Sequence, residues 1–353
     1  MQKKLIALAI TAAFASAPAF ADVTVYGKLD AGLGNMSTNT IAKTGADNAK
    51  TSTTAIAFSQ FYSSRFGVKG TENLGNGMNV TALVETGIGG PTTLGSREEN
   101  LALALGEGTT IKGGFGTTTL RNIAYGYDAI YGSNLIGNLL NDTKNPNGLS
   151  KELTKRSTYV EVGHNFGAIT ATADVMVNNT SIDNGPSTKT GSGFELGAVY
   201  GAGPLSVGGA YRNTKDSTAV NSTTTTLASD VTNKAFILGA SYDFGVAVVK
   251  AQYASVKVDQ GVALATPAAS DNSGESIGVD VPFTSAVAGF AQASFAKDKT
   301  TDQKSTGYAV GVKYDMSKNT FAYADIGGTK FDGNVNGTGL KASQYTIGMV
   351  QSF

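Results

Sequence analysis

The second half of this sequence repeats one unit, in which two strand-length segments share a short turn and a longer polar connection follows. The paired segments are 158–166 with 168–177, 194–200 with 205–212, 234–244 with 246–256, 276–281 with 287–295, and 307–315 with 320–326. The longer connections include 213–233, 259–275 and 331–339. Short and long connections therefore alternate, which puts every short turn at one end of a sheet. A soluble β-sandwich has no reason for that arrangement, whereas a barrel that crosses a membrane does.

The segment 63–87 holds two further strands around one turn. In its first limb Phe66 alternates with Arg65, and in its second limb Val84 alternates with Glu85, which is the period of two that a strand requires. The turn between the limbs is dense in Asn and Gly, which tolerate positive φ. We therefore predict a hairpin with Arg65 and Glu85 on its polar face.

Other strands precede and follow this hairpin. A first strand begins at Val23 with VTVYGKLDAGL, and a polar segment rich in Thr, Asn and Ala separates it from the hairpin up to about Thr54. Segment 96–105 is another strand, and GGFG at 113–116 is predicted as a turn into TTTLR. The stretch GEGTTIKGGFG lacks the spacing of a phosphate-binding loop, and no helical pattern follows it.

Counting all segments gives about sixteen strands of about ten residues each. On many strands the apolar residues share one face and end in aromatics, as in 236–244 and 308–314. The opposite face carries Gly, Ser, Thr and isolated charges, such as Asp174, Glu195 and Arg212, which we interpret as a solvated wall. The sequence thus predicts an all-β, antiparallel transmembrane barrel over residues 22–353, with short periplasmic turns and long extracellular loops.

Composition limits the alternatives. The first 21 residues carry Lys3 and Lys4, an apolar run and an A-x-A site, and are predicted to be a cleaved signal peptide. Without those two lysines, the 27 basic residues become 25 against 27 acidic ones, so a nucleic-acid partner is disfavoured. The chain has no Cys and one His, which excludes a disulfide framework and makes a zinc site improbable. We expect no cofactor.

Strand alternation stops between residues 122 and 155. This segment is rich in aromatics, Asn and Gly, and it is too long for a simple hairpin connection. Long loops of this kind are usually functional or disordered, and the aromatics argue against disorder. We predict an ordered functional loop here.

Five motifs together resemble the general porins of Gram-negative outer membranes, in the trimeric form common among betaproteobacteria. They are VTVYGKLD, SSRFGVKGTENLGNG, FGTTTLR, YDMSKNTFAYAD and the terminal YTIGMVQSF, and they span nearly the whole mature chain. The resemblance implies a trimer of sixteen-stranded barrels in the outer membrane. It also implies that the third loop, residues 122–155 here, folds into the lumen and narrows a channel for small hydrophilic solutes and ions.

The resemblance also implies site residues. Arg65 matches a wall arginine, Glu85 an acidic residue of the third strand, and Arg121 the arginine of a TLGR-type motif whose Gly is absent here. Strand alternation places all three inward, Arg121 together with Thr117 and Thr119. These two arginines against one carboxylate predict a modest anion preference at low salt.

Three further candidates complete the predicted constriction. Arg97 matches another arginine of the family, although its alternation with the leucines of 101–105 would turn it toward lipid unless a bulge intervenes. Asp128 is the candidate for the loop's acidic contribution. Arg156 lies with Lys155 where the wall resumes, and alternation does not decide which of the two faces inward.

The expected partners are small solutes and ions, the lipid bilayer with its lipopolysaccharide, two further copies of the chain, and the barrel-assembly machinery through Phe353. Three alternatives to a general porin stay open. They are a porin biased toward one solute, a non-conducting adhesion or assembly barrel, and a barrel enzyme. An enzyme of the hydrolase type needs a nucleophile beside a His and a carboxylate. The single His164 is expected near a short turn at the periplasmic rim.

Overall fold

The computed structural model describes residues 21–42, 47–89, 94–140, 149–177, 179–180, 187–219, 229–260, 269–332 and 338–353. The predicted signal peptide lies outside these residues, except for Ala21, where β1 begins. Within these ranges no helix has the length and apolar character needed to cross a membrane.

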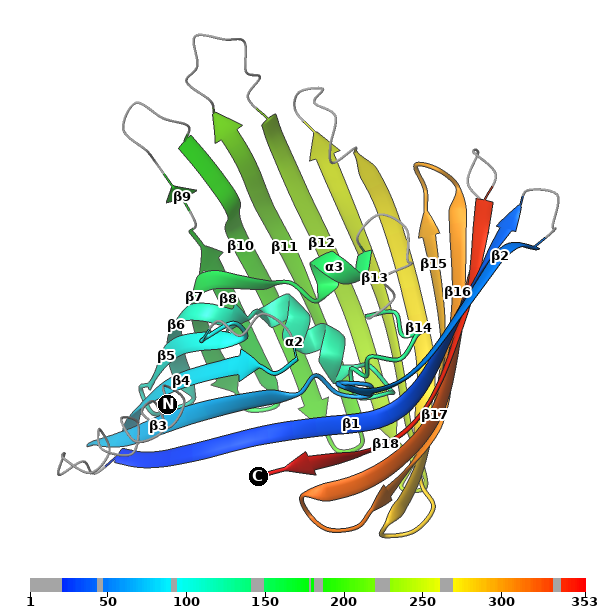
Figure 1. Cartoon of the computed structure of the whole chain (residues 1–353). Coiled ribbons are helices and arrows are strands. Elements are labelled where there is room, and N and C mark those ends of the chain that lie inside the picture. The colour runs from blue at the N-terminus through cyan, green and yellow to red at the C-terminus, as the bar shows by residue number, and fades with distance from the viewer. Residues whose placement is uncertain are drawn as a thin grey trace, which may run out of the picture.

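One antiparallel sheet closes on itself to form a barrel (Figure 1). Its strands are β1 (Ala21–Ala42), β2 (Asp47–Phe58), β3 (Arg65–Gly75), β4 (Met78–Gly87), β5 (Glu98–Ala104), β6 (Thr109–Thr117), β7 (Arg156–Phe166), β8 (Ile169–Met176), β9 (Asn179–Thr180), β10 (Ser187–Ala202), β11 (Leu205–Ala219), β12 (Ser229–Asp243), β13 (Val248–Gln260), β14 (Ser270–Pro282), β15 (Val287–Asp298), β16 (Gln303–Asp315), β17 (Thr320–Phe331) and β18 (Thr338–Ser352). Closure comes from the pairing of β1 with β18.

The eighteen strands form sixteen positions in the wall, because two positions are each built from two strands. The first half of β1 pairs with β3, and the second half pairs with β2. β2 and β3 are therefore one wall strand, interrupted by residues 59–64. β8 and β9 likewise both pair with β10. The predicted count of sixteen is confirmed.

Two local predictions about strands were wrong. The polar segment before the hairpin is not a connection, because β1 continues to Ala42 and β2 returns from Asp47. Segment 113–116 is not a turn but part of β6, and the turn lies at 106–108. Several predicted loops are also partly strand, for example the first part of 213–233. Along the distal part of β1 and in 213–219 the outer face is polar, and in 113–116 three of the four residues are Gly, so these segments show no alternation of apolar and polar side chains.

Side-chain sorting follows the predicted alternation. On β10 the apolar Leu196 is 52% exposed on the outer face, whereas its neighbour Glu195 points inward and is fully buried. The hairpin of β3 and β4 turns at Asn76 and Gly77, which both have positive φ as that turn requires.

The connection between β6 and β7 lies against the inner wall, as Figure 1 shows for its two short helices, α2 (Thr119–Gly126) and α3 (Leu149–Leu153). Its apolar side chains pack on inward-facing residues of β11–β13. This buried cluster contains Leu120, Ile123, Leu149, Leu153, Ala210, Ile237 and Val256. The barrel's main apolar core is thus the contact between the third loop and one side of the lumen.

Candidate functional site: a basic cavity beside the third loop

Buried charges on the wall hold the loop in place. The first backbone N–H groups of α2 donate to two wall carboxylates, Thr119 to Asp174 Oδ2 at 3.0 Å and Leu120 to Glu195 Oε2 at 2.7 Å. Carboxylates are favoured there because the N-terminal N–H groups of a helix have no partner within the helix. Arg212 pairs with Glu195 and donates from Nη1 to the carbonyl of Glu152 at 2.7 Å.

Asp174, Glu195 and Arg212 therefore do not form a solvated wall, as the sequence suggested. All three are fully buried beneath the loop. The alternation of residues along the strands correctly predicted that these three side chains point inward. It could not show that a segment distant in the sequence covers them.

The rest of the loop is held by two backbone contacts, and the first is to segment 59–64, where the carbonyl of Phe61 accepts a bond from the N–H of Asn134 at 2.8 Å. Asp30 of β1 accepts hydrogen bonds from the N–H of Phe61 at 2.5 Å and of Tyr62 at 2.6 Å, and from the Tyr323 hydroxyl at 2.7 Å. The loop touches the opposite wall at Gly137, whose carbonyl accepts a bond from Ser294 Oγ at 2.7 Å. A side chain at position 137 would collide with wall carbonyls, and its φ of 91° also requires Gly.

Between α2 and the wall lies a cavity of about 480 Å³. Its charged lining consists of five basic side chains and two carboxylates: Arg65, Arg97, Lys112, Arg121, Arg156, Glu85 and Glu98. Tyrosine rings from the loop and from segment 59–64 complete the lining, namely Tyr62, Tyr125 and Tyr131. The excess of three positive charges makes this the basic part of the lumen around α2.

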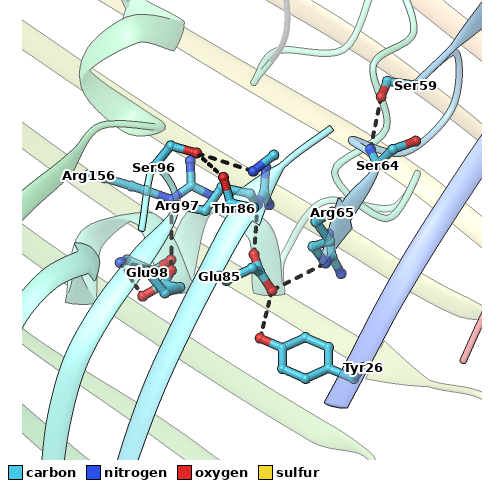
Figure 2. Close-up of polar contacts among 12 residues, drawn as sticks. Tyr26, Ser59, Ser64, Arg65, Glu85, Thr86, Ser96, Arg97, Glu98 and Arg156 are labelled. Atoms are coloured by element: carbon cyan, nitrogen blue, oxygen red, sulfur yellow. Dashed lines mark hydrogen bonds and ion pairs between the residues drawn. The ribbon is translucent and has the colours of Figure 1, made fainter. Parts of the chain in front are cut away.

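In one half of the cavity, Glu85 is the carboxylate that several side chains contact (Figure 2). Its carboxylate accepts a bond from Arg97 Nε at 2.6 Å, lies 3.5 Å from Arg65 Nε, and accepts a bond from the Tyr26 hydroxyl at 2.9 Å. One carboxylate thus serves two guanidinium groups, so these arginines keep a net positive charge together.

In the other half of the cavity, Glu98 is the carboxylate that several groups contact. It lies 3.7 Å from Arg156 Nε and accepts hydrogen bonds from the backbone N–H of Thr117 at 3.1 Å and from Asn100 Nδ2 at 3.1 Å. Lys112 instead pairs with Glu161 at 3.1 Å. The wall positions these groups through strand register, which keeps them fixed relative to one another.

Arg121 reaches the cavity from the loop and not from the wall. It was predicted to alternate with Thr117 and Thr119 on a strand, but β6 ends at Thr117 and Arg121 belongs to α2. Its guanidinium donates to the carbonyl of Thr154 and to the Tyr125 hydroxyl, and it lies 4.4 Å from the centre of that ring. Burial lowers the pKa of Arg121.

The alternation argument for Arg97 was also wrong. Arg97 precedes the start of β5, and its backbone N–H donates to the carbonyl of Glu85 at 3.1 Å, so the strand period does not extend to it. Its side chain lines the cavity. Of the two residues left undecided, Arg156 lines the cavity, whereas Lys155 lies 3.9 Å from Glu152.

Asp128 does not contribute an acidic group to the cavity. Its carboxylate is fully buried inside the loop, where it accepts hydrogen bonds from the N–H of Gly132 and from Asn138 Nδ2 at 3.3 Å. Burial raises the pKa of Asp128 to about 6. This residue organises the loop's own fold.

Sequence reasoning missed Glu98 and Lys112. Glu98 is directly opposite Glu85 in the pairing of β4 with β5, so counting back from the turn at 106–108 would have shown it to face inward. Lys112 was overlooked because segment 113–116 was taken for a turn.

Comparison with known proteins identifies the family. A family model described as Gram-negative porin matches residues 6–334. The chain belongs to the Gram-negative porin family. An outer membrane porin protein of Bordetella pertussis is 27% identical to this porin over 383 aligned residues, which cover 92% of this chain and 93% of that protein.

Solved structures agree on the porin fold. The anion-selective porin from Comamonas acidovorans superposes with a TM-score of 0.73 at 20% identity, over 94% of this chain and 100% of that chain. The trimer form of OmpT from Vibrio cholerae superposes with a TM-score of 0.62 at 19% identity, over 94% and 99%. As a Gram-negative porin, the chain is a channel for passive diffusion through the outer membrane.

Family membership points away from the enzyme alternative. His164 lies beside the short turn between β7 and β8, and its Nδ1 is 2.7 Å from Thr109 Oγ1. Its ring centroid is 4.3 Å from that of Phe166. The observed contacts thus give His164 a place at the rim, as predicted from strand order.

Proposed function

We propose that this porin favours small anions and that the basic cavity beside α2 is its constriction. The observation that carries the proposal is the ratio of five basic side chains to two carboxylates in one lining. Charges at a narrow, low-dielectric neck dominate the local potential even when the whole chain is nearly neutral. The excess positive charge therefore raises the local concentration of anions and lowers that of cations.

The proposal is tested by single-channel recording in a planar bilayer under a salt gradient. We expect a reversal potential of the sign that anion flow produces. The potential should be larger at 0.01 M than at 1 M salt, where the screening length falls from about 30 Å to about 3 Å. A reversal potential of the cation sign at low salt would refute the anion preference.

We also propose that the working form is a homotrimer with no catalytic activity. OmpT of Vibrio cholerae, which shares this fold, has been solved in a trimer form, and a closed barrel offers no strand edge at which a denaturant can begin. We expect a trimer in mild SDS that separates into monomers only on heating. A monomer on the unheated gel would contradict the trimer, while the conductance experiment would still test the channel.

The same recordings separate the remaining alternatives. An adhesion or assembly barrel would conduct little, and a porin biased toward one solute would show conductance that saturates with that solute. The basic cavity favours an anionic solute in that case too.

A further inference from the structure

Two of the tyrosine rings that line the basic cavity each carry an ammonium group against one face. Lys28 Nζ lies 4.3 Å from the centre of the Tyr62 ring, and Lys313 Nζ lies 4.0 Å from the centre of the Tyr131 ring. The lining of the cavity includes both rings but neither lysine. A solute in the cavity would therefore touch the rings and not the ammonium groups.

The two rings come from irregular segments that lie far apart in the sequence. Tyr62 belongs to the segment that interrupts the wall strand between β2 and β3, and Tyr131 belongs to the third loop. Asn134 joins these segments, because its backbone N–H donates to the carbonyl of Phe61 at 2.8 Å and its side-chain amide donates to the carbonyl of Ser59 at 2.9 Å. Both rings are thus held where the two segments meet.

The backbone at Tyr131 has an unusual conformation. Its φ is 62°, in the left-handed region that a bulky residue rarely adopts. The hydroxyl of Tyr131 donates to Asp280 Oδ2, and its ring packs edge-on against Phe290 with 6.0 Å between centroids. Tyr62 packs in the same way against Phe321 at 6.1 Å. A conformation that the surroundings impose in this way often marks a functional position.

The lysines make these rings compatible with an anion. The face of an aromatic ring carries partial negative charge, which by itself repels an anionic solute. An ammonium group is attracted to that charge and offsets it. Because Lys28 and Lys313 lie against Tyr62 and Tyr131, the two rings offer the cavity a flat apolar surface with little repulsion of anions.

The arginines of the same cavity have donors to spare. Arg97 uses its Nε for Glu85 at 2.6 Å, and the Nε of Arg156 lies 3.7 Å from Glu98 (Figure 2). Within the part of the chain that the structure describes, the terminal nitrogens of these two guanidinium groups have no hydrogen-bond partner. Guanidinium N–H groups suit a carboxylate, which can accept two of them in parallel. One cavity thus combines donors for a carboxylate with rings for a flat apolar group.

We propose that this cavity prefers aromatic carboxylates among small organic anions. The carboxylate lies at Arg97 and Arg156, and the ring of the solute lies against Tyr62 and Tyr131. The cavity volume of about 480 Å³ is within the range of roughly 300–1,000 Å³ that small-molecule sites have. This preference rests on the proposed function, because it requires the cavity to be the constriction.

The test compares two acids as blockers of the chloride current through many channels in a planar bilayer. Benzoate and cyclohexanecarboxylate both carry one negative charge at neutral pH, and they differ in whether the six-membered ring is aromatic. Half-maximal block gives a Kd for each acid. Contact between aromatic rings adds affinity beyond that of the buried area, so we expect the Kd of benzoate to be about two- to tenfold lower. Benzyl alcohol, which has the ring without the charge, should block weakly.

Variants of Tyr62 assign the preference to its ring. Tyr62→Leu should bring the two Kd values together, whereas Tyr62→Phe keeps the ring and should keep the difference. Tyr200→Leu, on the outer face of β10, is the matched control and should behave as the wild type. Heat-modifiable migration on gels shows whether each variant folds. The comparison of the two acids on the wild type decides the preference even if Tyr62→Leu does not fold.

Three outcomes would overturn the inference. Equal Kd values for the two acids on the wild type would exclude an aromatic preference, and an unchanged difference in folded Tyr62→Leu would exclude the role of that ring. Block by benzyl alcohol as strong as that by benzoate would show a site for a neutral ring. The reversal potential in potassium chloride tests the proposed function separately. A potential of the anion sign together with equal Kd values would overturn only the aromatic preference.

Discussion

Glu85 and Glu98 are directly opposite each other on β4 and β5, and both carboxylates line the same basic cavity. Such a pair would repel if it stood alone. Here Arg97 and Arg65 contact the first carboxylate and Arg156 lies near the second. The two glutamates therefore fix the arrangement of the arginines without neutralising it.

Removing a cavity arginine should weaken the anion preference. In Arg156→Gln we expect the reversal potential to move toward cations at 0.01 M salt and to change little at 1 M. A unit charge about 4 Å from an ion in water contributes about 1 kcal/mol, so the concentrations of anion and cation in the cavity should each change by about fivefold, in opposite directions. Lys318→Gln, which removes one charge from an exposed turn, is the control. Equal shifts in the two variants would show that Arg156 lies outside the constriction.

Removing a cavity carboxylate should have the opposite effect. In Glu85→Gln the amide keeps the size of the side chain, but it no longer compensates Arg65 and Arg97. We expect a stronger anion preference at low salt, recorded as a reversal potential further toward the anion limit. A shift toward cations would mean that the two arginines depend on Glu85 for their position in the cavity.

The loop should depend on the buried pair of Glu195 and Arg212. Glu195→Ala removes the fully buried carboxylate that pairs with Arg212, which leaves Glu152 Oε2 at 3.6 Å, and it also removes the acceptor for the N–H of Leu120. Breaking a buried ion pair in this way typically costs about 3–5 kcal/mol. We expect faster hydrogen exchange in α2 and noisier single-channel currents. Glu72→Ala, at an exposed position of β3, should leave both measurements unchanged.

Asp128 should make the loop less stable as pH rises. Its pKa in the folded loop is about 6, above the ordinary value of 3.8, so the folded loop favours the protonated carboxyl. The stabilisation is complete below about pH 4 and is lost as the pH rises through 6, by about 1–3 kcal/mol. Loop amides, corrected for intrinsic exchange, should be better protected at pH 4 than at pH 7.5. Asp128→Asn should remove this difference, and an unchanged difference would assign it to another group.

The C-terminal residue should matter for assembly. Phe353 exchanges two backbone hydrogen bonds with Gly27, at 2.9 and 3.1 Å, and its exposed ring lies over that glycine. Deleting Phe353 removes this last rung between β18 and β1. We expect a lower yield of inserted barrel, measured by surface protease accessibility and heat-modifiable migration. Gln351→Ala keeps the terminal aromatic residue and should insert normally, whereas normal insertion of the deletion would refute the role.

The sequence by itself determined the barrel, because apolar and polar residues alternate along each strand that has an apolar outer face. Each strand must turn apolar residues to lipid and polar residues to the lumen, so the period of two is readable wherever the outer face is apolar. That is why Arg65 and Glu85 could be placed inward. Where the outer face is polar, as along the distal half of β1, the same rule gave no signal.

Only the tertiary structure decided what the inward residues do. Arg212 and Glu195 have the alternation of a solvated wall, but the third loop crosses the lumen and buries them. Asp128 and Arg121 lie in that loop, where no strand period applies. The packing of the loop buries Asp128 in the loop's interior and places Arg121 in the lining of the cavity. The physical reason is that alternation fixes a direction for each side chain, whereas burial and charge pairing depend on segments that meet only when the barrel closes.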